Sequence, residues 1–249
     1  MFKISDKIVL RLAEAIKSGN VNKVREMLST HPLIPYFSSH ERDTFLHFAC
    51  SQDEISSEIV CCLAEKVDVK CRRDSDGSNP LHLACANPSA SISVLKILAT
   101  PETVNQKDKM GCTPLFYLSK HSDMERVRFL LSQGASEYAD GLRGACANER
   151  GDLEMVRLFL EEKKADVNSA DLFGRTPILF AFENEPKLEI IELLLQKGAD
   201  PNVESDGKSL YGRTPLHLAC ESKYISIDLI RLLLENGADP NFESDLFAR

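Results

Sequence analysis

The chain of 249 residues lacks any long apolar run and has no recognisable leader segment. Its apolar runs, such as the one over 190–195, last only a few residues, whereas a helix that spans a bilayer needs roughly 20. The N-terminus shows no apolar stretch ending at small residues, which argues against a secretory signal. These absences predict a protein without membrane insertion that resides inside the cell, in the cytoplasm or alternatively in the nucleus.

Signatures of catalysis and metal binding are also missing. No Gly-rich phosphate loop, Gly-x-Ser-x-Gly or His-Glu-x-x-His pattern occurs. The eight cysteines lack the paired Cys-x-x-Cys spacing of zinc sites, and without a signal they are expected to stay free thiols. We therefore predict no enzyme activity, no cofactor and no metal.

Charge is present but unevenly distributed. Residues 1–124 carry 15 basic and 15 acidic side chains, whereas residues 125–249 carry 15 basic and 23 acidic ones. An acidic surface repels phosphate backbones and attracts basic partners. The sequence therefore predicts a protein partner with a basic surface and no nucleic acid; the alternative is that the acids only keep this half soluble.

Internal repetition is the strongest feature of the sequence. The segment TPLHLAC at 214–220 is echoed at 79–85 and 44–50, more loosely at 113–115 and 176–178, and weakly at 12–15 and 142–146. Counted from the threonine position, the repeats begin near Leu10, Thr44, Asn79, Thr113, Asp140, Thr176 and Thr214. Their spacings are 34, 35, 34, 27, 36 and 38 residues.

Each repeat predicts a pair of helices. The threonine caps a first helix, and the following proline suits its first position. Apolar residues at helical spacing over 229–234 mark a second helix, which ends at Gly237. An Asp-x-x-Gly turn follows in several copies, as at 171–174. Since one helix pair cannot bury its own apolar face, the units are expected to stack into an all-α repeat solenoid.

In this motif and in the spacing of its copies, the sequence resembles the ankyrin-repeat family over nearly its whole length. The resemblance implies one domain over residues 1–249 of stacked helix-turn-helix units with short β-hairpin fingers, a concave partner-binding face and no catalytic group. It also implies structural roles for two repeated sets, with histidines bonding the turns between units and cysteines filling small apolar sites. These sets are His47, His82 and His217, and Cys50, Cys85, Cys146 and Cys220.

Departures from the repeat are the best candidates for specificity. The short spacing before Asp140 predicts a shortened or missing finger, while the first finger is aromatic and the last one is lengthened. The candidate partner-binding residues are Tyr36, Phe37, Tyr138, Asp140, Glu183, Tyr211 and Glu221. Alternatively, the unit at Asp140 is a decayed repeat, and the aromatics of the first finger shield the end of the stack.

Three cysteines, Cys61, Cys62 and Cys71, fall outside the repeat pattern. Neighbouring residues on a helix point about 100° apart, so one thiol of the pair 61–62 is expected to be exposed. A redox or modification role is the alternative to an inert surface thiol.

The last residues, 245–249, echo 171–175, which run directly into a Thr-Pro helix start. A terminal repeat usually exchanges apolar for polar residues, and 229–234 shows no such change. The pattern predicts that the chain is a fragment or that a further domain follows.

The leading hypothesis is a non-enzymatic protein–protein interaction scaffold, with a monomer favoured. Alternatives of the same class are a proteasome-assembly-chaperone-like ankyrin protein and the targeting domain of a larger kinase, channel or ubiquitin-ligase adaptor. An alternative of another class is a substrate of an asparaginyl hydroxylase, because Asn168, Asn202 and Asn241 stand in matching Ala-Asp-Val/Pro-Asn contexts.

Overall fold

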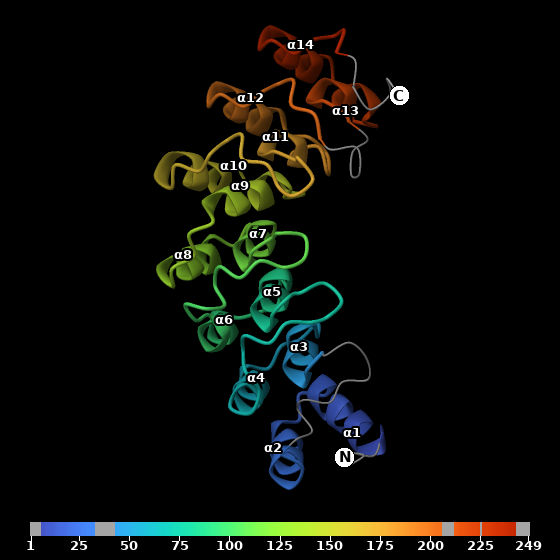
Figure 1. Cartoon of the computed structure of the whole chain (residues 1–249), viewed down its shortest axis with the longest axis vertical. Helices are drawn as coiled ribbons and strands as arrows, with labels where there is room; N and C mark the ends of the chain where they lie inside the picture. The colour runs from blue at the N-terminus through green and yellow to red at the C-terminus, as the bar shows by residue number, and fades with distance from the viewer. Residues whose placement is uncertain (1–5, 33–42, 206–211, 225, 243–249) are drawn as a thin grey trace. The chain divides into compact units, whose positions relative to one another are not determined.

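The computed structural model describes residues 6–32, 43–205, 212–224 and 226–242, and these ranges contain helices and turns but no strand. The helices form seven consecutive pairs (Figure 1). The first helices of the pairs are α1 (Asp6–Lys17), α3 (Phe45–Cys50), α5 (Pro80–Ala86), α7 (Pro114–Ser119), α9 (Tyr138–Cys146), α11 (Pro177–Phe180) and α13 (Pro215–Glu221). The second helices are α2 (Val21–Thr30), α4 (Ser57–Ala64), α6 (Ile92–Leu98), α8 (Met124–Ser132), α10 (Leu153–Arg157), α12 (Leu188–Gln196) and α14 (Ile227–Glu235).

Side-chain caps fix where these helices begin. Asn79 accepts a hydrogen bond from the His82 amide at 3.0 Å and so caps α5, and Ser91 caps α6 in the same way. The second helix α14 ends before Gly237, whose φ of 92° lies in the left-handed region that favours glycine. Both ends of the helix pairs are therefore encoded locally, as the repeat pattern predicted.

The fingers are tight turns rather than strand ladders. In the finger at 171–175, the Asp171 amide donates to the Arg175 carbonyl at 3.0 Å, and the Gly174 amide donates to the Asp171 carbonyl at 3.2 Å. The finger at 108–112 is closed in the same way. Each described finger is too short to add the further backbone pairs that a β-ladder would need.

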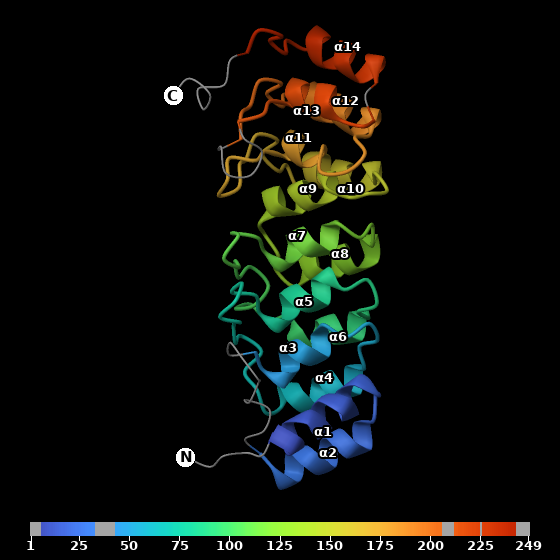
Figure 2. The same cartoon turned by 90° about the vertical axis from the view of Figure 1, so that its right-hand side faces the viewer.

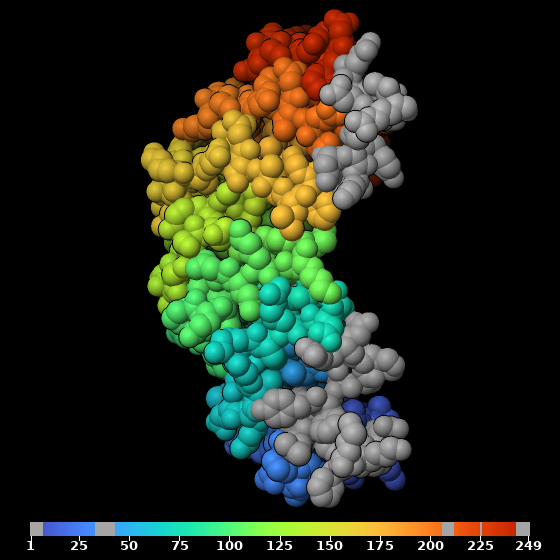
Figure 3. Space-filling model, in the orientation of Figure 1, coloured from blue at the N-terminus to red at the C-terminus, as the bar shows by residue number. Residues whose placement is uncertain are grey.

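By its internal contacts the chain divides into two compact units. Unit 1 comprises residues 1–117 and 125–136, and unit 2 comprises residues 118–124 and 137–249. In unit 1 the first helices α1, α3 and α5 follow one another in one layer and the second helices α2, α4 and α6 in another (Figures 1 and 2). In unit 2, α9 packs on α11 and α12 packs on α14. Within each unit the colours run in bands in chain order (Figure 3), as expected when each repeat packs on its sequence neighbours.

The fifth helix pair departs from the others. Only residues 133–137 connect α8 to α9, which agrees with the prediction that the finger before this repeat is shortened or missing. Its second helix α10 continues as a π-helical turn, η2 (Leu158–Glu162), which carries the fully buried Phe159. The Phe159 ring lies so close to Gly141 that a Cβ there would be 2.3 Å from a ring carbon. Gly141 thus allows the close approach that buries this ring.

Candidate partner-binding surface

Two adjacent repeat positions lie at the ends of the first helices. Counted from the threonine position of each repeat, the sixth residue is a buried cysteine in Cys50, Cys85 and Cys146. The seventh residue is Ser51, Ala86, Lys120, Ala147, Glu183 or Glu221, and of these only Ala147 is buried. In unit 2, Lys120, Glu183 and Glu221 reach the surface at this seventh position. Arg175 and Arg213, which directly precede the threonine position of their repeats, lie beside the two glutamates. We call these five residues the inner row.

Glu183 lies at the centre of the inner row. Its carboxylate accepts from Arg175 Nη1 at 3.0 Å and from Lys120 Nζ at 3.2 Å. Arg175 is itself held by Asp171, because its Nη2 lies 2.8 Å from Asp171 Oδ2. Glu183, one of the predicted partner-binding residues, therefore belongs to an ion-pair network that joins the finger at 171–175 to the ends of α7 and α11.

Glu221 repeats this arrangement one unit further along the chain. Its Oε1 lies 2.9 Å from Arg213 Nη2, and the two residues are eight apart, as Arg175 and Glu183 are. Glu221 is more exposed than Glu183. At both predicted acidic positions a basic side chain thus compensates the carboxylate, so this surface offers charges of both signs.

A hollow of about 450 Å³ adjoins Glu183 in unit 2. We call it the turn groove; it is lined by Glu149, Phe182, Glu183, Asn184, Glu185, Ser222, Lys223 and Tyr224. Tyr224 is 44% exposed, with Lys223 Nζ 4.7 Å from its ring centre. The sequence does not predict this groove, because its walls come from inter-helix turns of three different repeats.

The candidates around the missing finger are placed differently. Tyr138 is half-buried, with Lys163 Nζ 5.8 Å from its ring centre. Asp140 is only 1% exposed and forms an ion pair with Arg143, so it is not available to a partner on this surface. Its position inside α9, rather than at the helix start, explains the burial, because α9 begins at Tyr138. Tyr36, Phe37 and Tyr211 lie outside the described residues.

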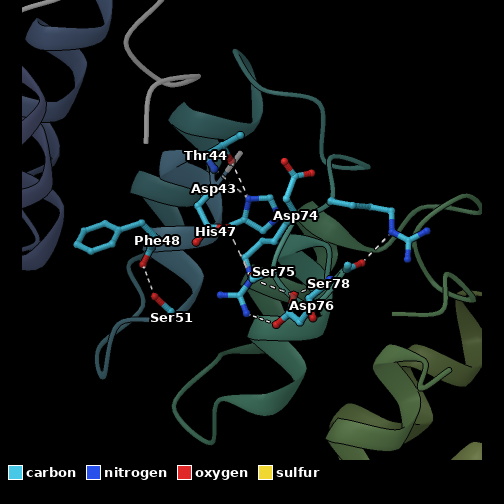
Figure 4. Close-up of polar contacts among 12 residues, drawn as sticks. Asp43, Thr44, His47, Phe48, Ser51, Asp74, Ser75, Asp76 and Ser78 are labelled. Carbon is cyan, nitrogen blue, oxygen red and sulfur yellow. Dashed lines mark hydrogen bonds and ion pairs between the residues drawn. The ribbon is translucent and has the colours of Figure 1, made fainter. Parts of the chain in front are cut away.

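The repeated histidines are part of the framework. The Asn79 amide donates to His82 Nδ1 at 3.1 Å, and His82 Nε2 lies 3.2 Å from the Cys112 carbonyl of the next finger. His47 likewise accepts from the Thr44 amide at 3.2 Å (Figure 4). Burial lowers the pKa of both imidazoles to about 4. Neutral, hydrogen-bonded imidazoles suit the structural role that the resemblance implied.

Arg143 takes the histidine position in the fifth repeat. Besides pairing with Asp140, its Nη1 donates to the Ser169 carbonyl of the next finger at 2.9 Å. It thus makes the same link to a following finger as His82, with a buried carboxylate in place of the usual cap residue.

The cysteines divide into buried and accessible groups. Burial raises the pKa of the Cys50, Cys85 and Cys146 thiols, which fits small apolar packing sites. Cys220, at the same repeat position, is exposed. All eight cysteines are free, and the described residues contain no His, Cys, Asp and Glu cluster suited to a metal ion.

The three irregular cysteines lie in unit 1. Cys61 is exposed and Cys62 half-buried, which confirms the prediction that one of this pair reaches the surface. Arg25 Nε donates to Cys62 Sγ at 3.4 Å. Cys71 lies 3.8 Å from the Thr44 hydroxyl, and burial raises the pKa of its thiol.

Two of the three candidate hydroxylation sites tie neighbouring repeats together. Asn168 Nδ2 donates to the Gly198 carbonyl at 2.8 Å, and its Oδ1 accepts from the Asp200 amide at 2.9 Å. Asn202 makes the same two bonds to Gly237 and Asp239. Asn241 is exposed, and its side chain makes no such bond within the described part of the chain.

Comparisons with known proteins agree with this architecture. A family model described as ankyrin repeats (3 copies) matches residues 46–140 and 142–244. The putative ankyrin repeat protein YahD of Escherichia coli is 28% identical over 72% of this chain and 90% of its own length. The ankyrin repeat protein nuc-2 of Neurospora crassa is 32% identical over 87% of this chain and 24% of its own length.

A further relative is, like nuc-2, longer than this chain. The chain spans 30% of the ANK repeat-containing protein nipk-1 of Caenorhabditis elegans, at 26% identity over 64% of its own residues. Among solved structures, the ankyrin repeat domain of Bcl-3 covers 90% of the chain with a TM-score of 0.59 at 23% identity, which shows the same fold. No helix in the described ranges combines the length and hydropathy that a membrane crossing requires. Because the ankyrin model matches most of the sequence and the helix pairs repeat as the motif requires, the chain belongs to the ankyrin-repeat family.

Proposed function

We propose that this chain is a non-enzymatic module that holds a partner protein against the inner row and the turn groove of unit 2. The observation that carries the proposal is the inner row, in which Lys120, Glu183 and Glu221 present charged side chains from one repeat position of unit 2. Members of the ankyrin-repeat family bind protein partners. The repeat pattern also explains the buried histidines and cysteines structurally, which leaves no candidate nucleophile or base among them.

The proposed partner presents basic side chains together with an apolar group. Glu149 and Glu185 contribute carboxylates to the rim of the turn groove, and the exposed ring of Tyr224 offers apolar and cation–π contact. Tyrosine is enriched among the residues that dominate binding energy in protein interfaces. The excess of acidic side chains after residue 124 would steer such a partner toward this half of the chain.

The test is affinity capture from a lysate of the source cells with quantitative mass spectrometry. The groove variant is Glu149→Lys with Glu183→Gln, and the matched control is Glu189→Lys with Glu192→Gln on α12, which changes the charge of the same unit equally. We expect a partner that the wild type and the control retain and the groove variant loses about tenfold, a difference of about 1.4 kcal/mol. Equal retention by all three proteins would contradict this placement of the site.

A second candidate function, as substrate of an asparaginyl hydroxylase, rests on Asn241. Hydroxylating Asn168 or Asn202 would require breaking two hydrogen bonds between repeats, whereas Asn241 is exposed and makes neither bond within the described residues. Co-expression with an asparaginyl hydroxylase should add 16 mass units to the Asn241 peptide before the other two. An unmodified Asn241 peptide would remove this candidate.

A further inference from the structure

Unit 1 carries a hollow that the proposed partner site does not use. Its volume is about 460 Å³, and it lies between the neighbouring second helices α2 and α4 (Figure 1). Its walls include Arg25 and Leu28 of α2 and Glu58, Cys61, Cys62 and Glu65 of α4. We call it the thiol hollow, because it is lined by two adjacent free cysteines. A volume of this size falls in the range of small-molecule sites, roughly 300–1,000 Å³.

The repeat pattern does not account for either thiol. Counted from the first residue of each second helix, the position of Cys62 holds a large apolar residue in every later repeat, namely Ile97, Phe129, Leu158, Leu193 and Leu232. The position of Cys61 holds a charged residue in the same repeats, namely Lys96, Arg128, Arg157, Glu192 and Arg231. Because a cysteine is smaller than any of these apolar residues, Cys62 leaves room where a larger side chain would stand.

Cys62 lies beside a guanidinium group from the preceding repeat. Arg25 Nε donates to Cys62 Sγ at 3.4 Å, and Cys62 is half-buried. A positive charge beside a thiol stabilises the thiolate, which is the nucleophilic form. The bond to sulfur uses the Nε–H group and not the Nη atoms, through which a guanidinium can bind a carboxylate at two points. A thiol and an anion-binding group therefore lie next to each other in one hollow.

The other charges of the thiol hollow are of both signs. Glu58 and Glu65 lie on α4, three or four residues to either side of the two cysteines, and Lys66 adds a second positive group. A ligand that carries only positive or only negative groups would be repelled by one of these sets. A small peptide with both carboxylate and ammonium groups is complementary to this arrangement.

We propose that Cys62 is a modification site that forms a mixed disulfide with a small peptide thiol carrying carboxylate and ammonium groups. The Cys62 thiolate attacks one sulfur of the peptide's disulfide, so that an S–S bond forms between Cys62 and one peptide while the original S–S bond breaks. The second peptide leaves as a thiolate and takes up the proton that Cys62 released to solvent. The peptide disulfide is the oxidant, and the step requires no other.

Cys61 does not reverse this step by forming a disulfide with its neighbour. Consecutive Cα atoms are about 3.8 Å apart, below the separation of roughly 4.4–6.8 Å that disulfides usually require. Both residues lie inside α4, where adjacent side chains point about 100° apart. The mixed disulfide at Cys62 is therefore expected to persist until an external thiol reduces it.

The exposed thiols of the chain provide a direct comparison. Cys61 and Cys220 are exposed, whereas Cys62 is half-buried. If access alone governed the reaction, both exposed thiols would react faster than Cys62. Recognition in the thiol hollow predicts the reverse order, because Arg25 stabilises the thiolate of Cys62 and binds the carboxylate of the incoming peptide.

The test uses oxidised glutathione as the probe and follows the mixed disulfide at each thiol of the full chain by peptide mapping and mass spectrometry. Cys220 of the same molecules is the internal reference. We expect Cys62 to react at least about tenfold faster than Cys220. The fast phase should remain in Cys61→Ser and disappear in Cys62→Ser, a matched pair that assigns the thiol although the two residues are adjacent. A fast phase that is lost in Cys61→Ser, or equal rates at Cys62 and Cys220, would overturn the proposal.

Arg25→Gln tests the anion-binding group. This variant should slow the reaction of Cys62 with oxidised glutathione about tenfold. The matched control is Lys23→Gln, which removes a positive charge from the same helix outside the hollow and should leave the rate unchanged. With 2-hydroxyethyl disulfide, an uncharged probe, the advantage of Cys62 over Cys220 should shrink. Equal slowing by both α2 variants, or an undiminished advantage with the uncharged probe, would contradict recognition by Arg25.

This modification site is independent of the proposed partner site. The residues of the thiol hollow belong to unit 1, and those of the turn groove belong to unit 2. The groove variant Glu149→Lys with Glu183→Gln should therefore react with oxidised glutathione like the wild type. A loss of the fast phase in this variant would contradict the assignment of the reaction to the thiol hollow.

Discussion

Lys120 Nζ lies 3.2 Å from Glu183 Oε2, although the two residues are two repeats apart. Both occupy the seventh position counted from the threonine position of their repeats, and Ala147 occupies that position in the repeat between them. A buried alanine leaves room for two long side chains to meet above it. The small residue of the fifth repeat therefore permits a contact that joins the ends of two first helices within unit 2.

A double-mutant cycle should measure that contact directly. Lys120→Gln and Glu183→Gln are expected to show a coupling free energy of about 0.2–1 kcal/mol, because both partners keep part of their contact with water. Urea unfolding of the four proteins gives the value, and high salt should reduce it. A matched cycle on the more exposed pair Arg231 and Asp228 should give a smaller coupling. A larger coupling at that exposed pair would contradict the geometry.

Substitution of Gly141 should destabilise the fold, because a side chain at this position would collide with the Phe159 ring. Gly141→Ala is expected to lower the free energy of unfolding by about 1–3 kcal/mol through overpacking. Adding Phe159→Leu should recover part of the loss, because it removes the ring atoms that a new Cβ would meet. Additive losses in the double variant, measured by thermal and urea unfolding, would show that the contact is not the cause.

The repeat pattern predicts the framework because each helix pair is encoded locally. The cap residues, the proline at the helix start and the terminal glycine set the helix ends, so the pairs around Thr44, Asn79 and Thr214 lie where the sequence placed them. The same logic misplaces the start of α9. No Thr-Pro marks it, and the helix begins at Tyr138, two residues before Asp140.

Surface relationships were harder to predict, because they join residues far apart in the chain. Asp140 looks like a surface acid in the sequence, and only the position of Arg143 on the next turn shows that it is buried in an ion pair. The turn groove combines Glu149, Asn184 and Tyr224 from three repeats. One signal was available: Lys120, Ala147 and Glu183 share one repeat position, which brings them into a single row.

The buried histidines predict how stability depends on pH. Burial lowers the pKa of His82 from 6.5 to about 4, so the unfolded chain binds a proton between these values that the folded chain does not. Stability is therefore fully present above pH 6.5 and falls as the pH drops toward 4, by roughly 3 kcal/mol per histidine. His82→Gln, which can still accept from the Asn79 amide, should make the stability curve shallower over this range. An unchanged slope, from urea unfolding at several pH values, would show that His82 does not contribute.

Asn202 and Asn241 form a natural pair for testing the bonds between repeats. Both follow Ala-Asp-Pro, but only Asn202 bonds the next repeat within the described residues, through the Gly237 carbonyl at 2.9 Å and the Asp239 amide at 2.7 Å. Asn202→Ala should lose two bonds of about 0.5–1.5 kcal/mol each. Hydrogen exchange of the Asp239 amide should accelerate about fivefold or more, since 1 kcal/mol corresponds to about that factor.

Asn241→Ala removes the same side chain from the same local sequence, so it controls for the loss of the amide itself. We expect it to leave both the Asp239 exchange rate and the free energy of unfolding close to wild type. Equal effects of the two substitutions would mean that these asparagines act within their own turns. A selective effect of Asn202→Ala would instead show that the two hydrogen bonds of Asn202 help to hold the last helix pair to the preceding repeat. It would also explain why an enzyme that modifies exposed asparagines should favour Asn241, whose side chain need not first break such bonds.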